Sequence, residues 1–333
     1  MKALVYDDVE TLRYREMPMP VPGRDEHLVR IEAVGICGSD MHAYLGHDER
    51  RPAPLILGHE AAGIVEDGPR NKERVAINPL VTCGACPACL SGRDNLCGTR
   101  QIISMPPRQG AFSEWIAIPG RNLVSVPDHV PLEQACLAEP IACGWHGARI
   151  GQHLLREKFD NPRVLVIGGG AIGLGSALSL RARGVSETAL VEENPKRRAY
   201  LEEVSDLKVL CVEDLATDDL FDLVIDGVGL SATRALASAR TRPGGAIIHI
   251  GLGEDTGGLD IRRMTLQEIT FVGTYTYTSS DFAETAQAIF DGRLGALDWF
   301  ESRPLENGAQ AFRDIRAGNS PCPKIVLIPR GPA

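Results

Sequence analysis

Three residue types that bind zinc stand close together near the start of the chain. Cys37 opens the stretch Cys37-Gly-Ser-Asp-Met-His42, and Gly58-His59-Glu60 follows after a loop. A thiolate, an imidazole and a carboxylate can hold a zinc ion and leave one coordination position open, as a catalytic zinc requires. Ser39 and His42 add a hydroxyl and an imidazole, which is enough for a proton path. One Cys and one His are a weak signal alone, so this interpretation depends on two further motifs.

Four of the nine cysteines form a second cluster, with the spacing C-x2-C-x2-C-x7-C. Short spacers that contain Gly and Pro let the backbone wrap one ion, and four thiolates close its tetrahedral shell. The sequence therefore predicts a structural zinc that braces a lobe and takes no part in chemistry. Four unrelated buried thiols are the alternative, and the spacing argues against it. The predicted ligands are Cys83, Cys86, Cys89 and Cys97.

A glycine-rich turn is the third motif. The apolar run 163–167 is typical of a parallel strand buried on both faces, and a helical pattern begins at Leu174. The pattern G-x-G-x-x-G lies between them, where a tight turn, a close approach of pyrophosphate and close helix packing each need a glycine. The predicted cofactor-binding residues of this turn are Gly168, Gly170, Ala171, Ile172 and Gly173.

An acidic residue ends the next predicted strand, 188–192. A carboxylate at Glu192 would accept hydrogen bonds from the adenosine ribose and repel a 2′-phosphate, which favours NAD over NADP. Arg197 and its neighbour Arg198 weaken that preference. Gly229 and Gly251 follow the predicted strands 223–226 and 246–250, at the strand ends where a cofactor would lie.

Bulk properties limit the class of protein. The 333 residues suggest two domains, and 44% hydrophobic with 24% charged residues is ordinary for a soluble globular protein. A net charge of −9 argues against a nucleic-acid partner. No stretch resembles a transmembrane span or a signal peptide, so we expect no membrane association and a cytoplasmic location. Short alternating runs before residue 35 predict β-strands. The sequence also predicts an amphipathic helix over residues 281–290 and a last strand over residues 324–328.

Two further features of the sequence are each consistent with two interpretations. Glu139 lies in an otherwise apolar helical stretch, where a carboxylate is costly unless it is paired or bound to metal, although a solvated glutamate at a helix start is equally consistent. Phe112 and Trp115 would line an apolar pocket or belong to the core.

Taken together, these motifs and the pair Glu139-Pro140 resemble the zinc-dependent medium-chain dehydrogenases over nearly the whole chain. Classical alcohol dehydrogenases have a cysteine where Glu139 stands, and the sorbitol, threonine and sugar-acid branch has glutamate. The resemblance implies an α/β fold with a GroES-like β-rich catalytic domain, residues 1–143 and 277–333, and a doubly wound Rossmann domain, residues 144–276.

The resemblance also implies roles for single residues. Cys37, His59 and one or both of Glu60 and Glu139 would surround the catalytic zinc, and Ser39 and His42 would relay the proton. The four clustered cysteines would hold the structural zinc, and Glu192 would bind the ribose. The family suggests a homodimer or homotetramer, often built partly by pairing Rossmann sheet edges.

The chain departs from the family pattern at two places. Residues 66–71 are shorter than the usual loop, and the Rossmann half between residues 209 and 222 is short, which puts adenine contacts in doubt. The loop 43–54 matches no one member well enough to name a substrate. Its His47, Arg50 and Arg51 slightly favour a polyol or a sugar acid over a plain alcohol.

The resulting hypothesis is an oxidoreductase that moves hydride from a secondary alcohol, of a polyol, sugar alcohol or sugar acid, to NAD. Zinc would lower the pKa of the substrate hydroxyl, and Ser39 would pass the proton, through the cofactor ribose, to His42 and solvent. The alternatives are an L-threonine or simple alcohol dehydrogenase and, more remotely, a non-catalytic NAD-binding redox sensor. The acidic balance opposes a zinc-ribbon nucleic-acid module.

Overall fold

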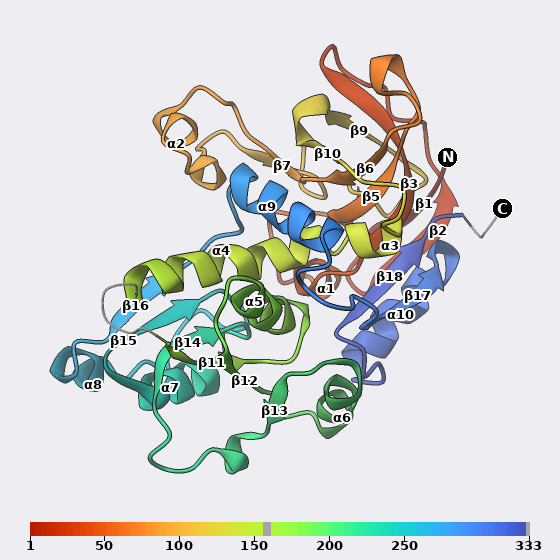
Figure 1. Ribbon diagram of the computed structural model, residues 1–333. Helices are drawn as coiled ribbons and strands as arrows, with labels where there is room; N and C mark the ends of the chain where they lie inside the picture. Colours follow the sequence, from red (N-terminus) through yellow and green to blue (C-terminus); the bar gives the residue numbers. More distant parts are fainter. Residues whose placement is uncertain (156–160, 331–333) are drawn as a thin grey trace. The chain divides into compact units, whose positions relative to one another are not determined.

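The computed structural model describes residues 1–155 and 161–330, which form two units (Figure 1). The first unit holds Met1–Glu139, Thr278–Asp291 and the residues from Phe300 on, and the second holds Pro140–Tyr277 and Gly292–Trp299. The sequence assigns all of 277–333 to the first domain, so the segment Gly292–Trp299 departs from that division. The reason is packing, because Trp299 is buried and the Arg293 guanidinium lies 5.7 Å from the Trp145 ring centroid.

The first unit is built from antiparallel sheets (Figure 1). Its largest sheet has the strand order β10-β6-β5-β3-β18-β17, with β9 also paired to β3, and only β17 and β18 run parallel. Smaller sheets have the orders β2-β1-β4 and β7-β8. The strands are β1 (Lys2–Asp8), β2 (Thr11–Glu16), β3 (Glu26–Gly35), β4 (Leu55–Ile56), β5 (Glu60–Val65), β6 (Arg74–Ile77), β7 (Leu80–Val81), β8 (Gln101–Ile102), β9 (Trp115–Pro119), β10 (Leu123–Ser125), β17 (Phe300–Pro304) and β18 (Lys324–Ile328).

Short helices connect these strands. They are α1 (Gly38–Tyr44), α2 (Pro87–Leu90), α3 (Leu132–Ala135), α9 (Ser279–Phe290) and α10 (Gly308–Arg316), and α4 (Ala138–Leu155) starts at the end of this unit. Phe112 is fully buried and meets Phe312 edge to face with ring centroids 6.0 Å apart, so it belongs to the core. Trp115 is half-buried, with the Arg330 guanidinium 5.4 Å from its ring centroid.

The second unit contains one parallel sheet with the strand order β13-β12-β11-β14-β15-β16. This is the doubly wound order of dinucleotide-binding domains. Its strands are β11 (Arg163–Ile167), β12 (Glu187–Val191), β13 (Lys208–Leu210), β14 (Phe221–Asp226), β15 (Thr241–His249) and β16 (Thr270–Gly273), and its further helices are α5 (Ala171–Ala182), α6 (Pro195–Val204), α7 (Ser231–Arg240) and α8 (Ile261–Leu266).

The predicted elements differ from the observed ones mainly at their ends. The helix predicted from Leu174 begins at Ala171, and the strand predicted to end at Glu192 ends at Val191. The short stretch between β13 and β14, whose residues are all described, contains only the 3₁₀ turn η4 (Val212–Asp214) where doubly wound folds often have a helix. Within residues 1–155 and 161–330, no helix has both the length and the apolar character needed to span a bilayer.

The glycine-rich turn joins β11 to α5 by very close backbone packing. Gly168 has φ +99°, a conformation that side chains with a Cβ rarely adopt. A Cβ on Gly173 would lie 1.7 Å from the carbonyl oxygen of Gly168. The helix can therefore begin directly after the turn only because residue 173 is glycine.

Substituting Gly173→Ala should lower the free energy of unfolding by about 1–3 kcal/mol, because the backbone must move apart to accept the methyl group. The shift should also weaken dinucleotide binding, because it displaces the start of α5. Denaturant unfolding and a binding titration measure the two effects.

Gly273→Ala is the matched control for this change. A Cβ on Gly273 meets no described atom within 4 Å, so its effect on stability should stay within about 0.5 kcal/mol. Equal effects of the two substitutions would contradict the role given to close packing at Gly173.

Candidate active site

Three ligand-type side chains meet at strand ends of the first unit. Cys37 follows β3 and is the N-cap of α1, while His59 precedes β5 and Glu60 begins it. Their thiol, imidazole and carboxylate ligand atoms all lie within 4.8 Å of one another. The register explains the meeting, because β3 and β5 pair antiparallel with Gly35 opposite Glu60. The end of one strand thereby faces the start of the other.

Glu60 is fully buried, and its two oxygens have different surroundings. Oε1 accepts a hydrogen bond of 2.6 Å from Nζ of Lys324, which also donates to the Ile36 carbonyl at 2.8 Å. Oε2 is buried and has no hydrogen-bond partner among the described residues. A Cβ on Gly35 would lie 2.0 Å from Oε2, so a side chain at this position would displace the Glu60 carboxylate. A buried carboxylate oxygen without a donor is costly, and a cation against it removes that cost.

Lys324 is the charge that balances this buried carboxylate. It is the first residue of β18 and is 4% exposed. Burial would lower the pKa of Lys324, but the charge of Glu60, with smaller effects from Cys37 and Glu139, raises it above its usual value. The pair is therefore an ammonium with a carboxylate, and removing either partner would leave a buried charge alone.

Asp40 fixes the two segments that carry the ligands. Its buried carboxylate accepts hydrogen bonds from the backbone N–H of Cys37 at 3.0 Å and of Gly58 at 3.2 Å. Its Oδ1 lies 3.4 Å from Nδ1 of His59, and the Ser104 hydroxyl lies 3.4 Å from the same nitrogen. Nδ1 is thus occupied, which leaves Nε2 of the ring for a metal.

Asp40 and His59 also shift each other's titration. Burial would raise the pKa of Asp40, but the charge and hydrogen bond of His59, and then Arg51, lower it. Burial would lower the pKa of His59, but the charges of Asp40 and Cys37 raise it well above its usual value. A metal ion would have to displace the proton from His59, because only neutral imidazole binds metal.

These residues fit a catalytic zinc. A thiolate, an imidazole and a carboxylate are its usual donors, the buried Oε2 of Glu60 lacks a partner within the described chain, and three ligands leave one position open. Glu139, the other predicted ligand, is buried in the first turn of α4 and lies outside this group of three. Its charge acts on Lys324.

The predicted relay residues lie on α1. Ser39 and His42 are three residues apart on this helix, so they face the same side, and both are half-buried. Arg51 holds the start of α1, because its guanidinium donates to the carbonyls of Ser39 at 2.8 Å and Ser104 at 3.1 Å. It is 2% exposed, and Arg50 is bound to Asp48. Arg50 and Arg51 therefore do not supply the free charges expected of the loop 43–54.

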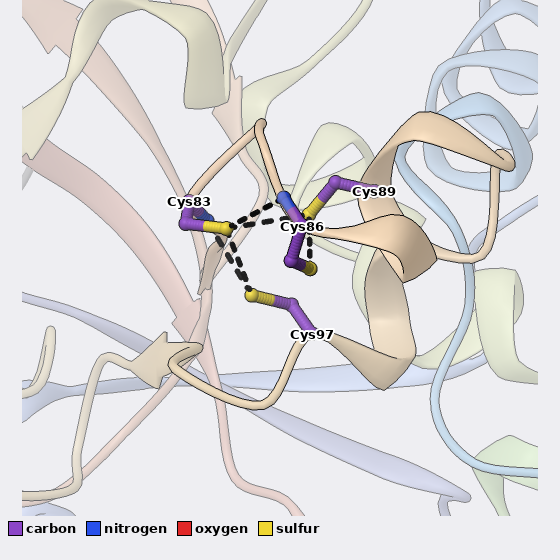
Figure 2. Close-up of side chains that lie close together, drawn as sticks. All are labelled: Cys83, Cys86, Cys89 and Cys97. Carbon is purple, nitrogen blue, oxygen red and sulfur yellow. Dashed lines mark hydrogen bonds between the residues drawn. The ribbon is translucent and has the colours of Figure 1, made fainter.

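The four clustered cysteines point their sulfurs toward one another (Figure 2). The Sγ–Sγ distances are 3.5 Å for Cys86–Cys89, 3.6 Å for Cys97–Cys83 and 3.9 Å for Cys83–Cys89. Tetrahedral bonds of about 2.3 Å to one zinc ion require sulfurs roughly 3.8 Å apart. Hydrogen bonds from the backbone N–H groups of Ala85 and Cys86 lower the pKa of the Cys83 thiol to about 6, which suits a thiolate ligand.

The cysteine lobe is tied to helix α9. Asp94, in the 3₁₀ turn η2 (Asp94–Leu96) between the third and fourth cysteines, accepts hydrogen bonds from the backbone N–H of Ser279 at 3.1 Å and from its hydroxyl. A carboxylate is favourable at a helix N-terminus, where N–H groups lack partners within the helix. A structural metal in the lobe would thus also brace the start of α9.

The predicted cofactor residues gather at the carboxyl edge of the parallel sheet. Among described atoms, nothing lies within 4 Å of a Cβ on Gly170, so space is open there for a ligand. Glu192 follows β12, and its carboxylate accepts from the N–H groups of Gly169 at 2.9 Å and Asn194 at 2.7 Å. Nη1 of Arg197 lies 3.9 Å from the same carboxylate.

The turns after β14 and β15 pack against each other at the same edge. Gly229 has φ +78°, and a Cβ on it would lie 2.2 Å from the carbonyl oxygen of Gly251. Asp226, at the end of β14, accepts from the N–H groups of Val228 at 3.0 Å and Gly229 at 2.9 Å. The two glycines are therefore needed for backbone packing, besides any contact with a cofactor.

Comparison with known proteins identifies the family. Residues 23–128 match the family described as alcohol dehydrogenase GroES-like domain, and residues 171–291 match the zinc-binding dehydrogenase family. The chain is 31% identical over 313 residues to L-galactonate-5-dehydrogenase of Escherichia coli K12, covering 89% of each chain. It is 30% identical over 295 residues to sorbitol dehydrogenase of Arabidopsis thaliana, covering 82% of this chain and 79% of that one.

The chain belongs to the zinc-dependent medium-chain dehydrogenases, in the polyol and sugar-acid branch. The solved structure of galactitol-1-phosphate dehydrogenase from Escherichia coli agrees, with a TM-score of 0.87 at 25% identity, covering 99% of this chain and 100% of that one. The family and fold predicted from the sequence motifs are thus confirmed.

Sequence reasoning on this dehydrogenase missed three residues that position the ligands. Asp40 had a local signal, because an acid three residues after an N-cap position often accepts from the cap N–H. Lys324 had no local signal in the sequence, since it follows its partner Glu60 by 264 residues. Gly35 had no local signal in the sequence either, because the constraint on its size comes from the Glu60 carboxylate in the folded protein.

Substituting Asp40→Asn should weaken zinc binding at the Cys37–His59–Glu60 site by about 10- to 100-fold, because the imidazole loses its orienting carboxylate. Competition with a chromophoric chelator, with the four-cysteine site kept loaded, measures it. Asp67→Asn is the matched control, because it breaks another contact to a histidine, at 3.0 Å from His27. An equal loss in both variants would contradict the role of Asp40.

The same substitution should have a pH signature in the metal-free protein. The contribution of Asp40, whose folded pKa is lowered, is present above 3.8 and is lost as the pH falls. The contribution of His59, whose folded pKa is raised, is present below 6.5 and is lost as the pH rises. The stability gap between wild type and Asp40→Asn should therefore be widest between pH 3.8 and 6.5 in denaturant unfolding. A gap that widens above pH 6.5 would disprove the pairing.

Substituting Lys324→Met should lower the stability of the metal-free protein by about 3–5 kcal/mol, because Glu60 loses its buried counter-charge. The loss should be smaller in the zinc-loaded protein, where a second cation faces the carboxylate. Denaturant unfolding of both forms measures the difference.

Lys2→Met is the control, because Lys2 and Glu16 form an exposed pair at 3.2 Å. Its loss should stay below about 1 kcal/mol in either form. A loss at Lys324 that is the same with and without zinc would show that Glu60 does not face the metal.

Proposed function

We propose that this dehydrogenase oxidises a secondary alcohol of a polyol, sugar alcohol or sugar acid and transfers the hydride to NAD. The observation that carries the proposal is the Cys37–His59–Glu60 group, with the Ser39–His42 pair close by in sequence, in a chain that also has a dinucleotide turn. The relatives named for L-galactonate and sorbitol support this substrate class.

The proposed roles follow the contacts. Zinc, when bound by Cys37, His59 and Glu60, supplies a Lewis acid that lowers the pKa of the substrate hydroxyl. The Ser39 hydroxyl accepts this proton while it releases its own toward the His42 imidazole, which passes a proton to solvent. Asp40 and Lys324 act as positioning residues, because they hold His59 and Glu60 through hydrogen bonds. Glu139 is also buried, and it stays the second carboxylate predicted for the same zinc.

NAD is the proposed cofactor, with NADP the alternative. The Glu192 carboxylate stands at the end of β12, where it would accept from the ribose hydroxyls and repel a 2′-phosphate. Arg197 offsets part of that charge at 3.9 Å. We therefore expect a preference for NAD and weaker use of NADP.

The bound arginines favour a neutral polyol within the proposed class. A threonine or sugar-acid carboxylate needs a cation, and Arg50 and Arg51 in the loop 43–54 are engaged by Asp48 and by backbone carbonyls. The non-catalytic redox sensor predicts lost ligands, and the chain retains Cys37, His59 and Glu60. The homodimer or homotetramer stays a prediction.

Reduction of NAD and of NADP tests the proposal, followed by nicotinamide absorbance over a panel of polyols, aldonates, threonine and simple alcohols. We expect zinc-dependent reduction with at least one polyol or aldonate and a preference for NAD. Cys37→Ala should abolish turnover and reduce the zinc content from two ions per chain to one.

Cys211→Ala is the matched control, because that thiol contacts Asp214 and belongs to neither cluster. It should leave both the zinc content and the activity unchanged. Activity with threonine or simple alcohols alone would favour the alternative dehydrogenases. If protein with both zinc sites loaded reduced neither NAD nor NADP with any alcohol of the panel, the proposal would be overturned.

A further inference from the structure

A cavity of about 440 Å³ lies within the second unit. Its walls come from helix α5, from the end of helix α6 and from the stretch Gly292–Trp299, and all three segments belong to that unit. The volume is in the range of small-molecule sites in proteins. None of the described residues predicted to bind the dinucleotide lines this cavity. It is therefore a separate candidate binding site.

One wall of the cavity is an apolar stripe on α5. Leu174 and Leu178 are four residues apart, and Arg181 follows three residues later, so the three side chains lie on one face of the helix. Leu294 and Trp299, both nearly fully buried, add to the apolar surface. Arg181 lies in the last turn of α5, at the end of the helix away from the glycine turn. The cavity thus has an apolar wall with a cation at its end.

The acidic residues of the cavity lie at the end of α6. Glu203 is in the last turn of this helix, and Asp206 follows the helix by two residues. The last turn of α6 contains no basic residue. The carboxyl end of a helix carries a partial negative charge, so a carboxylate there is unfavourable and a cation is favourable. This part of the cavity therefore favours a positively charged group.

The opposite charges of the cavity do not pair with each other. The side chains of Arg181, Glu203 and Asp206 are exposed, and none of them forms an ion pair or a hydrogen bond with another described residue. Arg293 is the other cation of the lining, and its guanidinium lies 5.7 Å from the Trp145 ring centroid. Arg181 and the two acids are thus available to a ligand that carries both charges.

The indole of Trp299 adds a donor to the wall. Trp299 is 1% exposed, and its Nε1 makes no hydrogen bond to any described residue. A buried indole N–H usually has an acceptor, and burying it without one is unfavourable. A carboxylate oxygen seated against this wall would be the missing acceptor.

The combination of groups selects a class of ligand. Arg181 and the Trp299 indole favour a carboxylate, the end of α6 favours an ammonium group, and the leucines of α5 favour an apolar chain. An α-amino acid with an apolar side chain has all three parts. A fatty acid would leave Glu203 and Asp206 without a partner, and an alkylamine would leave Arg181 without one.

We propose that this cavity binds an α-amino acid with an apolar side chain, with its carboxylate at Arg181 and its ammonium group at Glu203 and Asp206. The inference goes beyond the proposed function and does not rest on it, because it requires neither zinc chemistry nor a dinucleotide. It gives a ligand to residues that neither the metal sites nor the glycine turn uses.

Calorimetry on the full zinc-loaded chain, without cofactor or alcohol, tests the proposal with four probes. L-Leucine contains the carboxylate, the ammonium group and the apolar chain. Isocaproate is leucine without the ammonium group, isopentylamine is leucine without the carboxylate, and glycine lacks the apolar chain. We expect leucine to bind and each of the other three probes to bind at least about tenfold more weakly.

Substitutions then locate the bound leucine. Arg181→Gln and Glu203→Gln should each weaken leucine binding by about five- to tenfold, because each removes a charged partner. The matched controls are Arg262→Gln, at an exposed arginine of α8, and Glu202→Gln, at the exposed neighbour of Glu203. Neither control residue is among those that line the cavity, so both variants should bind leucine as the wild type does. All four substituted side chains are exposed, so the variants should fold.

Three outcomes would overturn the inference. The first is a wild type that binds no leucine at about 10 mM. The second is equal affinity for leucine and isocaproate, which would show that the acids bind no ammonium group. The third is unchanged leucine affinity in Arg181→Gln or Glu203→Gln, which would place the amino acid elsewhere, for example at the active-site zinc. The proposed function would stand in each case, because its failure is seen in the alcohol panel.

Discussion

The first unit depends on one constraint, which is that several charged groups are buried in a small volume. Asp40 and Glu60 are fully buried, and His59 and Lys324 are nearly so. Buried charges are stable only when each has a counter-charge or enough hydrogen bonds. Asp40 has two backbone N–H groups and His59, and Glu60 has Lys324 on one oxygen. The other Glu60 oxygen has no partner within the described residues. The cost of burying this oxygen would be removed by a metal ion bound against it.

This constraint explains the course of the chain. Cys37 follows β3 and Glu60 begins the neighbouring antiparallel strand β5, but the cation that balances Glu60 begins β18, 264 residues later. The chain returns to the first unit after the parallel sheet, and β18 pairs with β3 so that Val326 lies opposite Gly35. That register brings Lys324 to the Glu60 carboxylate. The last strand is therefore part of the candidate metal site as well as part of the sheet.

What the sequence could predict depended on how local each feature was. The four cysteines lie within fifteen residues, and the glycine turn lies between a strand and a helix, so spacing alone predicts both. Ser39, His42 and the three ligand-type residues were also predicted from motifs, and the structure brings the last three together. Lys324 and Gly35 act across the sheet, and no local pattern marks them. Arg51 shows the opposite error, because a charged residue in a loop suggests a substrate contact, while its guanidinium in fact binds backbone carbonyls.

The unsatisfied groups of the first unit show what the candidate metal site would gain from a cation. The second oxygen of Glu60 has no partner among the described residues, and contacts at Nδ1 of His59 leave Nε2 for a metal. Asp40 and Lys324 hold these groups in place through hydrogen bonds. Well-bonded neighbours thus sustain a local cost, and a cation that supplies the missing partner would gain the free energy that the protein gives up.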